Sequence, residues 1–120
     1  MAKRILLVED DLDIQRVYTE KLKNNGFEVI LAANASSGFQ YAKEENPNLI
    51  LLDIMLPGKM NGFEFLEILR KDENLKKIPV IVLTNLDTEK DQALKVGAKD
   101  YLIKANTSLN DLVTKVKKNI

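Results

Sequence analysis

The sequence predicts a doubly wound α/β sandwich, in which helices cover both faces of a sheet of five parallel strands. Short apolar runs alternate along the chain with longer stretches of helical periodicity, which makes five strand-then-helix units. The runs are apolar throughout, as expected of parallel strands that are buried on both faces. Five such units, joined by right-handed crossovers, are typical of this fold class.

The strands are predicted from apolar runs of three to five residues. The runs Ile5–Val8 and Leu49–Leu52 stop abruptly on carboxylates. Pro47 and Pro79 each precede a strand, where a missing backbone N–H does little harm. We expect strands near residues 4–8, 28–32, 49–53, 79–83 and 100–103.

The helices are predicted from apolar residues spaced three and four apart, most clearly near the C-terminus. Thr107 or Ser108 can cap the start of that last helix, and Asn25-Gly26 is a suitable end for the first. The second helix has the weakest pattern, because Gly38 in its interior costs about 1 kcal/mol relative to alanine. We expect helices near residues 12–24, 36–45, 62–71, 88–96 and 107–119.

Length and composition indicate a single domain over residues 1–120, with 45% hydrophobic and 30% charged residues. Eighteen basic and eighteen acidic residues cancel, so charge gives no reason to expect binding to nucleic acid or to an anionic membrane. The chain has no Cys and no His, which excludes disulfides, thiolate metal sites and a phosphohistidine of its own. The apolar runs are too short to span a bilayer, and we expect a cytoplasmic protein.

Polar residues follow the predicted strands at their carboxyl ends, which lie at one edge of a parallel sheet. That edge would gather Glu9, Asp10, Asp53, Thr84 and Lys104. Three carboxylates held together repel one another, so their ionised forms need a counter-charge. A hard cation supplies it, and an all-oxygen site suits Mg²⁺ better than Zn²⁺ or copper.

This cluster has the groups needed for phosphoryl transfer to a carboxylate. A divalent cation partly neutralises an incoming phosphoryl group, and an Asp nucleophile that forms an acyl phosphate is known chemistry. Lys104 would supply a second cation and Thr84 a hydrogen-bond donor, both directed at phosphoryl oxygens. Taken singly, Asp53 could instead be a strand-end cap, and Lys104 a solvated side chain. Similarly, Glu9 and Asp10 could be first-turn acids beside an Asp11 cap.

Five motifs stand in order at the predicted strand ends: ILLVEDD, LILLDIMLPG, Asn61-Gly62, VIVLTN and GAKDYLIK. Together they make essentially all 120 residues resemble a receiver domain of the two-component response regulators. The resemblance implies a flavodoxin-like sheet of strand order 2-1-3-4-5. It also implies that Asp53 is the phosphoacceptor and that Thr84 and Lys104 bind the phosphoryl group.

The resemblance further implies that Mg²⁺ is held by Glu9, Asp10, Asp53 and the backbone carbonyl of Met55. It makes Tyr101 the aromatic switch residue, which swings inward when Thr84 is drawn toward the phosphate. An aromatic residue on an edge strand can also merely pack.

The partners implied by the resemblance are a sensor histidine kinase or a histidine phosphotransfer protein. The domain would be a phosphoacceptor switch rather than an enzyme, with only self-phosphotransfer and slow self-dephosphorylation. Its slow loss of phosphate is expected because Met55 and Leu86, which flank the path of an attacking water, are apolar. The downstream target stays open, as do a missing output domain and a phosphorylation-linked dimer.

The chain departs from the family pattern in three places. The loop from Pro57 to Asn61 is one residue longer than usual, and the interval from Thr84 to Lys104 is about two residues shorter, so the fourth helix or its loop should be abbreviated. Ala105 stands where the family usually has a proline in a cis peptide bond. We predict a cis bond here too, since it would keep the usual direction of Lys104, although it costs ~2.5–4 kcal/mol before a residue other than proline.

Two other function classes are consistent with an acidic cluster on such a sheet. A hydrolase of the aspartyl-phosphate type would want a second Asp two residues after the nucleophile, where this chain has Met55, and 120 residues leave no room for a cap domain. A docking module without chemistry would not need all five site residues. The sequence therefore favours a phosphorylation switch.

Overall fold

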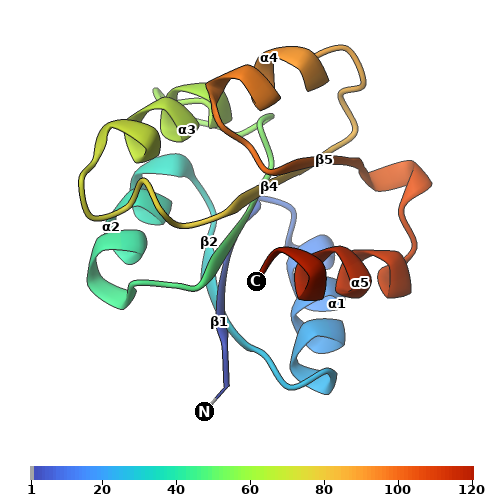
Figure 1. The fold of residues 1–120 in the computed structure, drawn as a ribbon. Helices are drawn as coiled ribbons and strands as arrows, with labels where there is room; N and C mark the ends of the chain where they lie inside the picture. Colours follow the sequence, from blue (N-terminus) through green and yellow to red (C-terminus); the bar gives the residue numbers. More distant parts are fainter. Residues whose placement is uncertain (1) are drawn as a thin grey trace.

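The computed structural model describes residues 2–120 and shows five parallel strands between two layers of helices (Figure 1). The strand order is β2-β1-β3-β4-β5, which confirms the predicted doubly wound fold. Four strands continue into a helix that crosses back over the sheet, and the fifth leads into the last helix. The strands are β1 (Arg4–Val8), β2 (Glu28–Ala32), β3 (Leu49–Leu52), β4 (Val80–Thr84) and β5 (Asp100–Ile103).

The helices agree with the predicted ranges, with two differences. They are α1 (Leu12–Asn24), α2 (Ala35–Glu45), α3 (Gly62–Lys71), α4 (Lys90–Val96) and α5 (Leu109–Asn119). The last helix was predicted to begin near residue 107, but it begins later because Ser108 caps it by accepting from the N–H of Asp111 at 3.0 Å. The fourth helix begins at Lys90 and not near residue 88, and Glu89 before it makes no side-chain cap.

Each face of the sheet has its own core. Alternate strand residues point to opposite faces, so Leu6 and Val8 pack under α2, α3 and α4, whereas Ile5 and Leu7 pack under α1 and α5. The central strands β1, β3 and β4 are almost entirely buried. This burial explains why their sequences are apolar runs and do not alternate.

Gly38 belongs to the face of α2 that packs on β1. A Cβ at this position would lie 3.0 Å from a methyl carbon of Val8, so glycine lets the helix approach the strand closely. The residue that weakened the helical prediction is therefore explained by packing.

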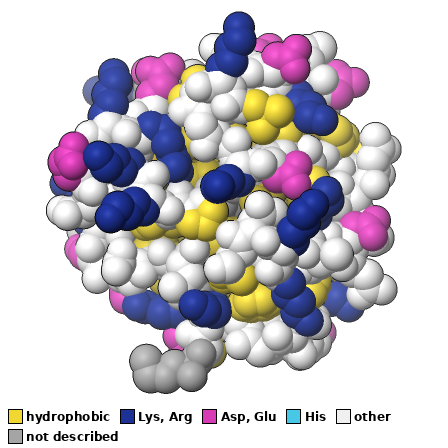
Figure 2. Space-filling view, in the orientation of Figure 1, with side chains coloured by type: hydrophobic (Ala, Val, Ile, Leu, Met, Phe, Trp, Pro, Cys, Tyr) yellow, Lys and Arg dark blue, Asp and Glu magenta, His cyan; other side chains and the backbone are white. Residues whose placement is uncertain are grey.

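Charged side chains are distributed over the surface. Figure 2 shows Lys and Arg scattered over one face, with acidic and apolar side chains between them. Over residues 2–120, no helix combines the length and the apolar character that crossing a membrane requires.

Candidate functional site

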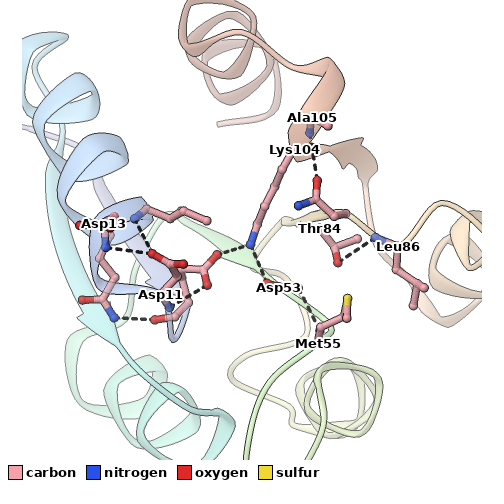
Figure 3. Close-up of polar contacts among 12 residues, drawn as sticks. Asp11, Asp13, Asp53, Met55, Thr84, Leu86, Lys104 and Ala105 are labelled. Atoms are coloured by element: carbon pink, nitrogen blue, oxygen red, sulfur yellow. Dashed lines mark hydrogen bonds and ion pairs between the residues drawn. The ribbon is translucent and has the colours of Figure 1, made fainter.

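The carboxyl ends of the strands bring together the polar residues that the sequence singled out. The β1–β3 pairing ends at Val8 and Leu52, so Glu9 and Asp53 leave the sheet side by side. The β4–β5 pairing ends at Thr84 and Ile103, so Lys104 leaves the sheet at the same edge as Glu9 and Asp53. Figure 3 shows Asp53, Thr84 and Lys104 converging on one site, although they come from three strands.

Three carboxylates form the centre of this site. One oxygen from each of Glu9, Asp10 and Asp53 lies within 4.8 Å of the others. Glu9 and Asp53 are buried, with exposed fractions of 2% and 6%, whereas Asp10 is exposed. Buried carboxylates need a cation or hydrogen-bond donors. All the possible ligands in this cluster are oxygen atoms, which are the ligands that hard metal ions prefer.

The Lys104 ammonium supplies one positive charge to this cluster. Its Nζ lies 2.7 Å from Oδ2 of Asp53 and also binds Oε1 of Glu9. Burial alone would lower the pKa of Lys104, but hydrogen bonds and charges from Asp53 and Glu9 outweigh it and raise the pKa above its usual value. The contacts with Asp53 and Glu9 therefore favour the charged form of Lys104.

Glu9 is only partly compensated by that cation. Burial raises the pKa of Glu9 above its usual value, although hydrogen bonds from Lys104 and from the backbone N–H of Asp11 act in the opposite direction. A nearby divalent cation would favour the ionised form of Glu9. The single positive charge of Lys104 thus does not balance the negative charges of the three carboxylates, and a further cation would stabilise them.

Asp53 is held by its own loop as well as by Lys104. Its second oxygen, Oδ1, accepts from the backbone N–H of Met55 at 2.9 Å, and its backbone N–H donates to the carbonyl of Val8 at 3.1 Å. The Met55 side chain, in contrast, is 57% exposed and points away from the core. Asp53 is therefore an oriented, largely buried carboxylate at a strand end.

Thr84 and Tyr101 are joined through one residue, Leu86. The backbone N–H of Leu86 donates to Oγ1 of Thr84 at 3.3 Å, and the Tyr101 hydroxyl donates to the carbonyl of Leu86. Both side chains are buried, and Tyr101 lies inward. A movement of Thr84 toward the site would thus act on the loop that Tyr101 also holds.

Asp11 is the N-cap of α1. Its Oδ1 accepts from the N–H groups of Asp13 and Ile14 at 2.9 and 3.0 Å. This agrees with the capping role that the sequence suggested, and it separates Asp11 from the carboxylate cluster.

The predicted cis bond between Lys104 and Ala105 is wrong, because every peptide bond of residues 2–120 is trans. The chain instead enters a short 3₁₀ turn over Lys104–Asn106, and the Lys104 ammonium still reaches Asp53. The prediction failed because it assumed that only a cis bond could direct the Lys104 side chain toward Asp53, whereas a trans 3₁₀ turn does so as well. The interval before Lys104 contains α4, which has seven residues and is the shortest of the five α-helices; its shortening relative to the family stays a prediction.

Sequence reasoning missed three residues that shape the site. Gln15 is buried and donates from Nε2 to the backbone oxygen of Glu9 at 2.5 Å. Gly62 packs against the backbone of Asp53 and Ile54, and Asn85 accepts from the N–H of Ala105 at 3.0 Å. Each had a signal in the sequence: Gln15 lies one helical turn after the Asp11 cap, and Gly62 and Asn85 stand in the Asn61-Gly62 and VIVLTN motifs.

Comparison with known proteins identifies the family. The family model described as "Response regulator receiver domain" matches residues 5–117 of this chain. This chain belongs to the response regulator receiver domain family. Receiver domains are phosphoacceptor switches and not classical enzymes.

Individual relatives agree with this assignment. The phosphate regulon transcriptional regulatory protein PhoB of Escherichia coli (strain K12) is 39% identical over 119 residues, which cover 98% of this chain and 51% of that protein. The chain thus spans about half the length of that relative. The structure of chemotaxis protein CheY4 from Vibrio cholerae matches with a TM-score of 0.90 and 28% identity over 100% of both chains. The Mn(2+)-bound form of response regulator Rcp1 matches with a TM-score of 0.81 and 35% identity, over 97% of this chain and 90% of that one.

Proposed function

We propose that this receiver domain accepts a phosphoryl group on Asp53 from a phosphohistidine of a sensor kinase or phosphotransfer protein, in the presence of Mg²⁺. The observation that carries the proposal is the contact of the Lys104 ammonium with Asp53 inside a cluster of three carboxylates. Residues 1–120 contain no His, so the donor imidazole lies outside these residues.

In the proposed reaction, a carboxylate oxygen of Asp53 attacks the phosphorus atom and forms a new O–P bond. The N–P bond of the donor breaks, and its electron pair returns to the imidazole. Lys104 and Thr84 then direct an ammonium and a hydroxyl at the phosphoryl oxygens, where they stabilise negative charge in a largely buried site. Positioning and charge supply the catalysis, as in other phosphoryl transfers.

Glu9, Asp10 and Asp53 fit a Mg²⁺ ion by chemistry and by proximity. Their oxygens lie within 4.8 Å of one another, and oxygen is the ligand that Mg²⁺ prefers. We include the backbone carbonyl of Met55 as a fourth ligand. Mg²⁺ would neutralise charge on these carboxylates and on the phosphoryl group. The Mn(2+)-bound form of the similar regulator Rcp1 supports a divalent cation in this fold.

We propose that Thr84 and Tyr101 carry the signal away from Asp53. When the Thr84 hydroxyl turns to a phosphoryl oxygen, its hydrogen bond from Leu86 is exchanged for a new one. The loop that bears Leu86 also holds the Tyr101 hydroxyl, so the surface around α4 and β5 would change. A downstream target, a further domain or a second copy in a phosphorylation-linked dimer would read this change.

Uptake of phosphate by Asp53 tests this proposal directly. The protein is incubated with acetyl phosphate and Mg²⁺, and the intact mass is measured. We expect one added phosphoryl group in the wild type and in Asp13→Asn, which removes an exposed carboxylate outside the cluster. Asp53→Asn should gain nothing, and chelation of Mg²⁺ should abolish uptake. An Asp53→Asn protein that gains the same mass would refute the assignment.

A further inference from the structure

A single side-chain hydrogen bond joins the two loops that carry Thr84 and Lys104. Oδ1 of Asn85 accepts from the backbone N–H of Ala105 at 3.0 Å, across 20 residues of sequence (the dashed line at Ala105 in Figure 3). The backbone pairing of β4 with β5 has its last Cα pair at Thr84 and Ile103. Asn85 thus continues, with its side chain, a connection that the strands no longer make.

The bond lies where the backbone at Lys104 changes direction. Lys104–Asn106 form a 3₁₀ turn between β5 and α5. The first N–H groups of any helical turn have no partner within the turn, and Ala105 carries one of them. Asn85 accepts from it, while Oγ1 of Thr107 donates to the carbonyl of Ile103 at 2.8 Å on the other side of the turn. Two side chains therefore clamp the backbone on either side of Lys104.

The direction of the Lys104 backbone matters because its side chain must reach two buried carboxylates at once. The ammonium binds both Asp53 and Glu9 and is itself mostly buried, with a side-chain exposed fraction of 10%. The lysine side chain has four flexible methylene groups, so its ammonium is held at one place more easily when the Cα of Lys104 is fixed. In a preorganised site, a displacement of about 1 Å can cost a large factor in rate.

We propose that Asn85 is a positioning residue. It holds the backbone of the Lys104–Asn106 turn, in which the Lys104–Ala105 bond is trans, where the Lys104 ammonium can reach Asp53. The inference rests on the proposed phosphoryl transfer for its kinetic consequence. Its structural part does not depend on that function. Because Asn85 is exposed, water competes for Ala105 when the amide is removed, and the expected effect is moderate.

The test compares Asn85→Ala with Asn106→Ala, which removes another exposed asparagine from the same turn. Hydrogen exchange of the Ala105 amide and the resonance of Lys104 Nζ are followed by NMR in both variants. The initial rate of Asp53 phosphorylation by acetyl phosphate is measured at saturating Mg²⁺, together with the melting temperature. In Asn85→Ala we expect faster exchange at Ala105, a shifted Lys104 resonance and a rate lowered about two- to tenfold. Asn106→Ala should resemble the wild type.

Other results would overturn the inference. Unchanged exchange at Ala105 would mean that the bond does not hold the turn, and an unchanged Lys104 resonance would mean that the bond does not place the ammonium. A faster reaction in Asn85→Ala would show that Asn85 only narrows access to Asp53. If no protein takes up phosphate, the wild type included, the proposed function fails. The two NMR measurements then still decide the role of Asn85.

Discussion

Gly62 lies against the backbone of Asp53, so that a Cβ at position 62 would come within 2.8 Å of the Asp53 carbonyl oxygen and within 2.3 Å of Cα of Ile54. The start of α3 is thereby packed onto the end of β3. The same junction is stabilised by a capping box, in which Asn61 and Glu64 bind each other's backbone N–H. This packing helps to set the direction in which Asp53 leaves the sheet.

We therefore predict that Gly62→Ala destabilises the protein and impairs the site. The new methyl group would meet backbone atoms, which cannot turn aside as a side chain can, and overpacking of this kind costs about 1–3 kcal/mol. Urea unfolding measures the loss of stability, and acetyl phosphate uptake measures the effect on Asp53.

Gly38→Ala is the matched control for Gly62→Ala. A Cβ at position 38 would meet a Val8 methyl carbon at 3.0 Å, and a side chain can shift by a few tenths of an ångström. Alanine also gains about 1 kcal/mol over glycine inside a helix, which offsets this contact. We expect Gly38→Ala to lose much less stability. Equal unfolding midpoints for Gly62→Ala and the wild type would contradict the argument.

Asp10→Asn should weaken the binding of Mg²⁺. Loss of one negative charge about 4 Å from a divalent ion costs roughly 2 kcal/mol even in bulk water, which corresponds to an affinity about 30-fold lower. Isothermal titration calorimetry at fixed ionic strength measures this affinity. Asp13→Asn changes the net charge equally but lies outside the cluster, and its affinity should stay close to that of the wild type. Unchanged binding in Asp10→Asn would remove Asp10 from the metal site.

The phosphorylated form should lose its phosphate slowly for a receiver domain. Met55 and Leu86 are apolar, so neither can orient a water molecule or take its proton. Met55→Asn places an amide two residues after Asp53, at an exposed position, and should shorten the lifetime several-fold, whereas Met55→Leu should not change it. The decay is followed by intact mass after acetyl phosphate is removed. A wild-type lifetime at the short end of the range for receiver domains would count against this prediction.

Much of the fold could be predicted because its signals are local. A strand buried on both faces must be apolar throughout, and this marked β1, β3 and β4. Because parallel strands end at one edge, the same pattern placed Asp53 and Lys104 near each other although 51 residues separate them. Capping likewise suggested Asp11 from residue type and position, and it narrowed the cap of the last helix to Thr107 or Ser108, of which the structure shows Ser108.

The errors fall where distant residues decide the local structure. The cis prediction considered only the loop around Lys104 and could not include the hydrogen bond that the Ala105 N–H donates to Asn85. Gly38 looked unfavourable in a helix because intrinsic propensity does not include the methyl group of Val8 on the facing strand. In both cases a tertiary contact outweighed a local preference.

By itself, the sequence determined the order of strands and helices along the chain and which polar residues stand at the strand ends. Both follow from the spacing of apolar residues that are close together in the sequence. Only the tertiary structure decided how those side chains meet: the ammonium of Lys104 between Asp53 and Glu9, the loop shared by Thr84 and Tyr101, and the trans turn held by Asn85. These contacts join residues that are far apart in the chain, and their geometry is fixed by packing across the whole sheet rather than by any local pattern.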